Sequence, residues 1–212
     1  MENILNSIYI LGGMGVILGS ALAVSSKRSR TSAAKSQTGT EAEEEAGIRR
    51  LARIKCSGTK KVIRTKYKYE GISDCVAASK LIGGPKLCPY ACLGLGTCVA
   101  SCPHDAIELT DGIASVDSRK CQSCRTCIDA CPKRVIHMVP DSGKPWVKCS
   151  SRNQEAVVRQ ICDKGCIGCG DCISACEFDA VKIENDLAQI DQVKCRNCAA
   201  CLAKCPRRTI SS

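Results

Sequence analysis

The chain has 212 residues, twenty of them cysteine, and its formal net charge is +10 at pH 7. Aromatic residues make up only 3% of the chain, with one Trp and one Phe, which excludes a fold built on a large aromatic core. A basic balance of this size can indicate nucleic-acid binding, but the cysteine pattern described below gives it another explanation.

The first 26 residues are predicted to form a transmembrane anchor. Residues 4–24 contain no charged side chain, and a helix of this length would be about 31 Å long, enough to cross the hydrocarbon core of a bilayer. Lys27, Arg28 and Arg30 follow at once, so the positive-inside rule places the rest of the chain in the cytoplasm. We therefore expect a single-pass protein of the bacterial inner membrane. A cleaved signal peptide is the alternative, but the segment lacks a basic n-region.

Two segments separate this anchor from the cysteine-rich part. Residues 27–47 are rich in Ser, Thr, Ala, Lys and Glu without an apolar period, which is typical of a flexible linker. Residues 48–87 carry mixed helix and strand signals, so we predict a small α/β segment that packs on the module after it.

The cysteines that follow form an internal repeat. Eight of them, shifted by 74 residues, coincide with eight others: Cys88, Cys92, Cys98, Cys102, Cys121, Cys124, Cys127 and Cys131 fall on Cys162, Cys166, Cys172, Cys176, Cys195, Cys198, Cys201 and Cys205. A fixed offset across so many reactive residues indicates one structural unit used twice. We place the units at residues 88–140 and 162–212, joined by a connecting strand and helix at 141–161. Residues 106–117 and 180–191 are predicted to form short hairpins around Asp111-Gly112 and Asn185-Asp186.

The spacing within each unit is that of iron–sulfur ligands. Residues 121–132 and 195–206 both read Cys-x2-Cys-x2-Cys-x3-Cys-Pro, and residues 166–176 repeat the four-cysteine core. This is the run of bacterial ferredoxins, in which the fourth thiolate reaches a neighbouring [4Fe–4S] cluster. A disulfide framework has no reason to repeat such runs, and structural zinc prefers separated pairs. The expected fold class is α+β, with the transmembrane helix followed by two tandem bacterial-type 2[4Fe–4S] ferredoxin modules.

Applying this rule predicts four [4Fe–4S] clusters, each with four cysteine ligands. The ligand sets of the second module are Cys166, Cys169, Cys172 and Cys205, and Cys195, Cys198, Cys201 and Cys176. One set of the first module is Cys121, Cys124, Cys127 and Cys102. The other has only Cys92, Cys98 and Cys131, because Leu95 stands where the second module has Cys169. We predict Cys88 as its fourth ligand.

Four cysteines have no place in this scheme: Cys56, Cys75, Cys149 and Cys162. The simpler interpretation is that they are buried small hydrophobic residues near the cluster loops. A fifth metal site would use the right number of thiols, but these four are scattered in the sequence without a paired spacing. Cys56 and Cys149 share a Lys-Cys-Ser context, which suggests a repeated strand.

Bound clusters would also explain the positive charge. A [4Fe–4S] core with four thiolates carries about −2, so four clusters would contribute about −8. We therefore predict no nucleic-acid partner. The basic residues that remain, such as Lys60 and Lys61, would lie on solvated faces or on a docking surface for an acidic electron carrier.

Further segments of the chain match a known family. They are Cys56-Ser57-Gly58-Thr59, residues 67–72 (YKYEGI), residues 83–90 (GGPKLCPY), residues 92–98 (CLGLGTC) and residues 165–169 (GCIGC). Together with the N-terminal span, they resemble the B subunit of the Rnf-type ion-translocating electron-transport complex. The chain departs from the family pattern at Glu177, where Pro is usual, and residues 25–47 lack the additional cysteine motif that family members carry after the membrane helix.

The resemblance implies a membrane-anchored polyferredoxin. Such a protein takes electrons from reduced ferredoxin and passes them through its clusters to other membrane and redox subunits, while the complex couples ferredoxin-to-NAD⁺ transfer to Na⁺ or H⁺ export. It is a non-catalytic electron-transfer subunit of a translocase, so no catalytic residue is predicted. The alternative is a stand-alone, membrane-tethered polyferredoxin that serves no ion pump.

Overall fold

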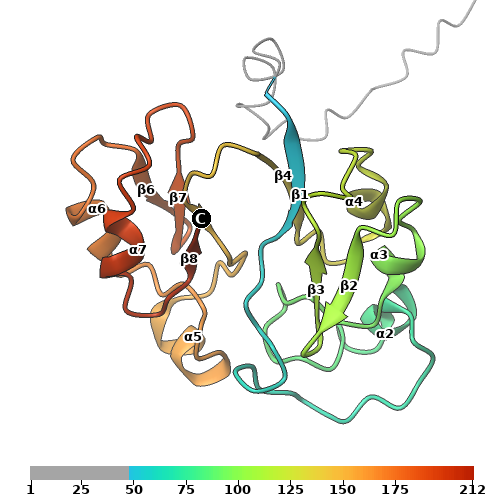
Figure 1. Cartoon of the computed structure of the whole chain (residues 1–212). Helices are drawn as coiled ribbons and strands as arrows, with labels where there is room; N and C mark the ends of the chain where they lie inside the picture. The colour runs from blue at the N-terminus through green and yellow to red at the C-terminus, as the bar shows by residue number, and fades with distance from the viewer. Residues whose placement is uncertain (1–47) are drawn as a thin grey trace, which may run out of the picture. The chain divides into compact units, whose positions relative to one another are not determined.

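A computed structural model describes residues 48–212 of the chain (Figure 1). The transmembrane anchor and the linker predicted for residues 1–47 lie outside the described residues. Between residues 48 and 212, no helix combines the length and the apolar character that a membrane crossing requires.

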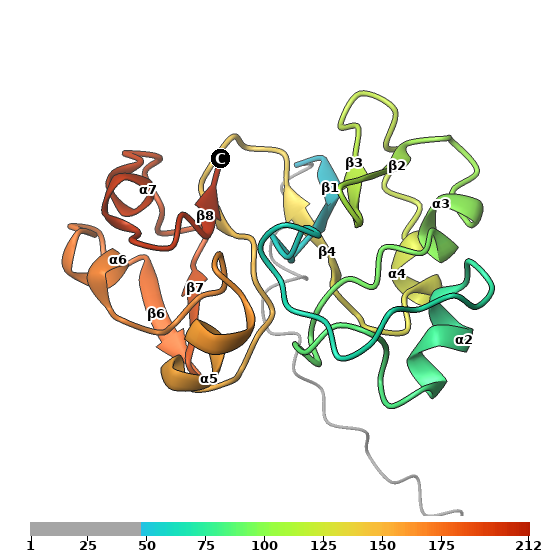
Figure 2. The same cartoon turned by 90° about the horizontal axis from the view of Figure 1, so that it is seen from below.

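The described chain forms two groups of elements, which both Figure 1 and Figure 2 show side by side. The first group contains β1 (Arg50–Ile54), α2 (Cys75–Lys80), α3 (Thr97–Ala100), β2 (Ile107–Thr110), β3 (Ile113–Val116), α4 (Thr126–Ala130) and β4 (Ile136–Pro140). The second contains β5 (Trp146–Val147), α5 (Glu155–Ile161), α6 (Asp171–Ser174), β6 (Val181–Glu184), β7 (Leu187–Ile190), α7 (Ala200–Lys204) and β8 (Ile210–Ser211).

The 74-residue offset of the cysteines also relates these elements. Shifted by 74 residues, α3 falls on α6, β2 on β6, β3 on β7 and α4 on α7, each over its whole length. The first residues of β4 and β8 are related in the same way. The 74-residue repeat of the cysteines is therefore also a repeat of the helices and strands.

Each group contains two antiparallel strand pairs. The two predicted hairpins are present, as β2–β3 and β6–β7. In each hairpin both residues between the strands have positive φ, namely Asp111 and Gly112 in the first and Asn185 and Asp186 in the second. Two-residue turns of this kind match the right-handed twist of the paired strands.

The other two pairs close each group with a strand from outside the repeat. β1 pairs with β4, so that Ile54 lies opposite Ile136, and β5 pairs with β8, so that Val147 lies opposite Ile210. Directly after β1 and β5 come the two Lys-Cys-Ser segments, at residues 55–57 and 148–150. The pairing therefore brings Cys56 and Cys149 to equivalent places at the edge of each group.

The cores contain cysteine alongside aliphatic residues. Leu51 and Val135 are almost wholly buried, with exposed fractions of 0% and 1%, and they pack in a cluster that includes Cys92, Cys98 and Cys127. Val147, Leu187 and Ile210 form the corresponding cluster of the second group with Cys172 and Cys201. The thiols thus occupy interior positions of both cores.

Candidate metal centres

Four loops carry the cysteine runs, and they share one backbone conformation. In each loop the third and fifth residues have positive φ: Gly94 and Gly96, Ser123 and Arg125, Gly168 and Gly170, Asn197 and Ala199. Backbone of this kind can direct N–H groups to one side, as in the nests that bind anions and iron–sulfur clusters. The loop at 92–98 keeps the conformation although Leu95 stands in place of a cysteine.

This first loop packs tightly on the hairpin of its own module. A Cβ atom at Gly94 would lie 2.0 Å from the carbonyl oxygen of Gly112, in the β2–β3 turn. Because Gly94 also has a φ of +71°, no other residue type fits there without moving the backbone. The hairpin therefore fixes the position of the loop.

Four pockets lie against these loops, and each is lined by four cysteines. The four quartets are Cys75, Cys92, Cys98 and Cys131; Cys102, Cys121, Cys124 and Cys127; Cys166, Cys169, Cys172 and Cys205; and Cys176, Cys195, Cys198 and Cys201. Their empty volumes are similar, from about 300 to about 360 Å³. Three quartets consist of the residues of the predicted ligand sets, including the fourth cysteine from the partner run.

The first quartet differs from its predicted set at one residue. Cys75 lines the pocket of Cys92, Cys98 and Cys131, whereas the predicted fourth ligand, Cys88, lines another pocket. The physical reason lies at Leu95, which packs with Cys75 and its neighbours in a small apolar cluster. This contact seats helix α2 on the loop, so that the Cys75 thiol lines the pocket.

Hydrogen bonds fix Cys75 at the start of α2. The Asp74 carboxylate caps the helix, because its Oδ1 accepts from the backbone N–H of Ala77 at 2.7 Å. The Thr97 hydroxyl donates to Asp74 Oδ2 at 2.9 Å and accepts from the N–H of Cys75 at 2.6 Å. The Ala77 N–H and the Thr97 hydroxyl lower the pKa of Asp74. Because Thr97 directly precedes Cys98, this hydrogen-bond network fixes Cys75 and Cys98 relative to each other.

Burial controls the protonation of the thiols. It raises the pKa of Cys98 to about 12 and the pKa of Cys127 and Cys172 to about 11. Cys124 lies at the surface, where the hydroxyl and N–H of Thr126 lower its pKa. Cys98, Cys127 and Cys172 therefore stay protonated at neutral pH until a metal displaces the proton.

The arrangement of the thiols fits a cluster better than a single ion. All twenty cysteines lie within residues 48–212, and none of them forms a disulfide. In this same region, no three His, Cys, Asp or Glu side chains converge closely enough to bind one metal ion. Zinc would need its sulfur ligands about 2.3 Å from a common centre, whereas a cubane spreads four thiolates over four irons.

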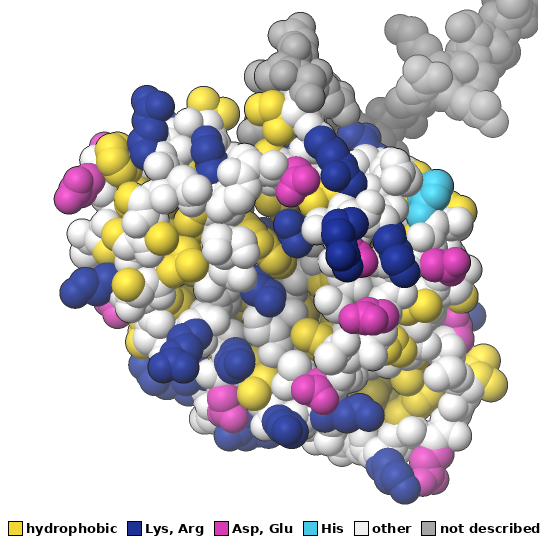
Figure 3. All heavy atoms as spheres, in the orientation of Figure 1, with side chains coloured by type: hydrophobic (Ala, Val, Ile, Leu, Met, Phe, Trp, Pro, Cys, Tyr) yellow, Lys and Arg dark blue, Asp and Glu magenta, His cyan; other side chains and the backbone are white. Residues whose placement is uncertain are grey.

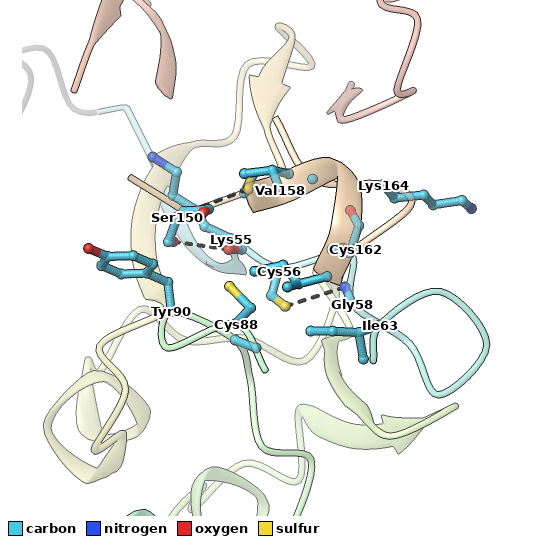
Figure 4. Close-up of a pocket in the computed structure, with 16 residues that line it drawn as sticks. Lys55, Cys56, Gly58, Ile63, Cys88, Tyr90, Ser150, Val158, Cys162 and Lys164 are labelled. Carbon is cyan, nitrogen blue, oxygen red and sulfur yellow. Dashed lines mark hydrogen bonds between the residues drawn. The ribbon is translucent and has the colours of Figure 1, made fainter. Parts of the chain in front are cut away.

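A fifth pocket is lined by the remaining four cysteines, Cys56, Cys88, Cys149 and Cys162 (Figure 4). Three of them have no role in the ligand scheme predicted from the sequence, because no ferredoxin run contains them. Two signals connect them nevertheless. Cys56 and Cys149 share the Lys-Cys-Ser context, and the 74-residue offset relates Cys88 to Cys162.

Comparison with known proteins agrees with this site chemistry. The family model of the 4Fe–4S dicluster domain matches the chain at residues 91–135, 120–180 and 165–209, which together span more than half of it. The matches cover both predicted ferredoxin modules. The cofactors of the chain are therefore multiple [4Fe–4S] clusters.

Three curated relatives confirm the resemblance to the Rnf type. The chain is 42% identical over 165 residues to the B subunit of the Na⁺-translocating ferredoxin:NAD⁺ oxidoreductase complex of Acetobacterium woodii, covering 77% of this chain and 50% of that protein. It is 46% identical over 166 residues to the B subunit of the proton-translocating ferredoxin:NAD⁺ oxidoreductase complex of Clostridium ljungdahlii, covering 77% and 58%. It is 39% identical over 158 residues to the B subunit of the ion-translocating oxidoreductase complex of Methanosarcina acetivorans, covering 74% and 60%.

The chain thus spans between 50% and 60% of the length of these relatives. The four loops that carry the cysteine runs lie within the part that matches the family model, whereas Cys75 lies outside it. By its cysteine runs, its repeated fold and these matches, the chain belongs to the 4Fe–4S dicluster domain family.

Proposed function

We propose that this chain is the electron-relay subunit of a membrane-bound, ion-translocating oxidoreductase complex of the Rnf type. The observation that carries the proposal is the gathering of its cysteines into quartets within a region that is 39–46% identical to the B subunits of such complexes. The [4Fe–4S] clusters supply one-electron transfer when bound. The chain itself supplies no group for bond chemistry at these sites.

The proposed ligand sets follow the four quartets of the pockets. Three sets remain as the sequence predicts them, and in the remaining one Cys75 takes the place of Cys88 beside Cys92, Cys98 and Cys131. Each pocket combines thiols from one run with thiols from outside that run: two in the first quartet, Cys75 and Cys131, and one in each of the other three. In the second module both extra thiols come from the partner run, and this exchange keeps the two sites adjacent, as a relay requires.

The surroundings of the thiols would tune the relay. Backbone N–H groups donate to sulfur at Cys102, Cys166 and Cys205, with distances of 3.4 to 3.5 Å from Ala106, Ala188 and Thr209. Hydrogen bonds to sulfur and the exclusion of water are the main means by which a protein sets the potential of a cluster. These backbone groups thus act on the sites electrostatically, without touching a substrate.

The proposed electron donor is a reduced ferredoxin, and the acceptors are membrane and redox subunits of the complex. Exposed basic residues offer a docking surface for an acidic carrier, because complementary charge speeds encounter. Lys60, Lys61 and Lys66 are exposed in one segment, and Figure 3 shows Lys and Arg side chains spread over the face in view. Attachment to the membrane would come from the apolar span predicted at residues 4–24.

Affinity purification of the tagged full-length chain in mild detergent tests the proposal. We expect multi-span membrane subunits and a flavin-carrying, NAD⁺-reducing subunit to co-purify, and reduced ferredoxin to bleach the visible cluster absorption of the complex. A chain that purifies alone yet accepts electrons from ferredoxin would instead support a stand-alone membrane-tethered carrier, which the absence of cysteine from residues 25–47 favours. A chain that ferredoxin does not reduce would contradict both functions.

A further inference from the structure

The pocket of Cys56, Cys88, Cys149 and Cys162 is the one quartet drawn from both halves of the described residues. Cys56 and Cys88 come from the first half, Cys149 and Cys162 from the second. All four are buried, with exposed fractions of 7% to 8%. The empty volume of the pocket is about 340 Å³, within the range of the four quartets in the ferredoxin modules. In size and donor set it is therefore equivalent to them.

Backbone N–H groups donate to two of the four sulfur atoms of this pocket. Cys56 Sγ accepts from the N–H of Gly58 and from the N–H of Cys92, both at 3.4 Å, and Figure 4 shows the first of these bonds. Cys149 Sγ accepts from the N–H of Ser151 at 3.4 Å. At both cysteines, one donor lies two residues further along the chain. N–H···S bonds stabilise thiolate sulfur, which is the form that binds iron.

The two halves are joined reciprocally at this pocket. The Ser57 hydroxyl donates to the carbonyl of Lys148 at 3.1 Å, and the Ser150 hydroxyl donates to the carbonyl of Lys55 at 3.0 Å. In each Lys-Cys-Ser segment, therefore, the serine hydroxyl donates to the lysine carbonyl of the other segment. The segments place Cys56 and Cys149 in equivalent positions on opposite sides of one site.

Backbone pairing fixes Cys162 in the same way. The N–H of Arg64 donates to the carbonyl of Ile161 at 2.9 Å, and the N–H of Asp163 donates to the carbonyl of Val62 at 2.8 Å. These bonds flank an isolated bridge between Ile63 and Cys162. A segment of the first half therefore holds a cysteine of the second half at the pocket.

A buried cation lies beside these thiols. Lys86 is only 6% exposed, and its Nζ donates to the carbonyls of Gly58 and Gly112 at 2.9 and 2.8 Å. Its electrostatic neighbours are the thiols of Cys56, Cys92, Cys162 and Cys88, of which all but Cys92 belong to this pocket. Among residues 48–212, no carboxylate pairs with Lys86, and a buried charge without a counter-charge is costly. A bound group of net negative charge would supply that counter-charge.

We propose that Cys56, Cys88, Cys149 and Cys162 bind a fifth [4Fe–4S] cluster between the two ferredoxin modules. Such a cluster with four thiolates carries a net charge of about −2, and this negative charge would offset the positive charge of buried Lys86. The proposal requires cluster binding by the chain, but it does not require the electron-relay function proposed above.

The location puts the fifth site next to one site of each module. On the first-module side, the N–H of Cys92, a residue of the first quartet, donates to Cys56 Sγ. On the second-module side, Arg207 lines the pocket of Cys166 and Cys205 and donates to the carbonyl of Cys162. The five sites therefore form one series, with the fifth site in the middle.

Native mass spectrometry of the anaerobically purified wild-type chain counts the clusters directly. We expect five [4Fe–4S] units and about twenty irons per chain, because a fifth cubane has only these four cysteines left as ligands. A count of four clusters would overturn the proposal, and so would zinc bound in place of the fifth cluster. If the chain binds four clusters and accepts electrons from reduced ferredoxin, the proposed electron-relay function still holds.

Matched double variants then locate the fifth cluster. Cys56→Ala/Cys149→Ala removes two ligands and should lower the count from five to four. Ser57→Ala/Ser150→Ala, in the same two segments, removes the reciprocal hydrogen bonds but keeps all four thiols, and it should retain five. Five clusters in the cysteine variant would overturn the assignment. If that variant does not fold, Cys162→Ala alone should show the loss, and an unchanged count there would overturn the assignment equally.

Discussion

The two ferredoxin modules differ at one cysteine position of their cluster loops, which is Leu95 in the first and Cys169 in the second. The second module completes each quartet from its own two runs. The first keeps the same loop backbone without the thiol, and Cys75 lines the pocket from helix α2. The comparison shows that loop conformation and ligand identity are separable. Positive-φ residues and the packing of Gly94 on the hairpin fix the loop, and a thiol from another element can then complete the site.

Removal of iron is expected to unfold both modules, so that they no longer differ. The buried cores of residues 48–212 contain no aromatic side chain and include many cysteines, so metal binding is expected to supply much of the free energy of folding. Anaerobic chelation at mild acidity, followed by far-UV circular dichroism, should show the loss of most of the regular structure. A metal-free chain that still unfolds cooperatively would contradict this expectation.

Loss of the fourth thiol should affect both modules equally. We expect Cys75→Ala in the first module and Cys169→Ala in the second each to eliminate the EPR signal of one [4Fe–4S]⁺ cluster, because three protein thiolates leave one iron without a ligand. Integrated EPR of the reduced variants, compared with the wild-type chain, measures the loss. If Cys75→Ala retained every signal while Cys169→Ala lost one, the role of Cys75 would be disproved.

Moving the thiol back into the loop should restore the site. The loop at 92–98 has the same positive-φ pattern as the loop at 166–172, so a cysteine at position 95 would occupy the place of Cys169. We therefore expect Leu95→Cys/Cys75→Ala to recover the cluster that Cys75→Ala loses, seen as iron content and EPR intensity near the wild-type values. Failure to recover would mean that the two loops are not equivalent at the metal.

The smallest effect is expected at the cap of α2, which has no counterpart in the second module. Asp74→Ala should lower the free energy of unfolding by about 1 kcal/mol, the usual contribution of a side-chain N-cap. Anaerobic denaturant unfolding of the cluster-loaded chain measures it. Gln154→Ala is the matched control, because Gln154 is the N-cap residue of α5 and makes no capping hydrogen bond. Equal effects of the two substitutions would contradict the assigned role of Asp74.

The sequence predicts what is encoded locally or by the repeat. The 74-residue offset anticipates the loops and the hairpins, because each depends on turn residues within a few positions. Cys75 and the fifth quartet depend on contacts between distant segments. Cys75 reaches its pocket through the packing of Leu95 and the network of Thr97, and Cys56 meets Cys149 only because β1 and β5 each close a different module. No spacing rule within a run contains that information.

Anomalous diffraction at the iron edge, from crystals of the anaerobic, cluster-loaded chain, shows directly which cysteines bind iron. We expect five iron peaks, one in each cysteine quartet, with Cys75 bonded in the first module and with Cys56, Cys88, Cys149 and Cys162 bonded between the modules. Four peaks, with Cys88 bonded beside Cys92, Cys98 and Cys131, would contradict this assignment.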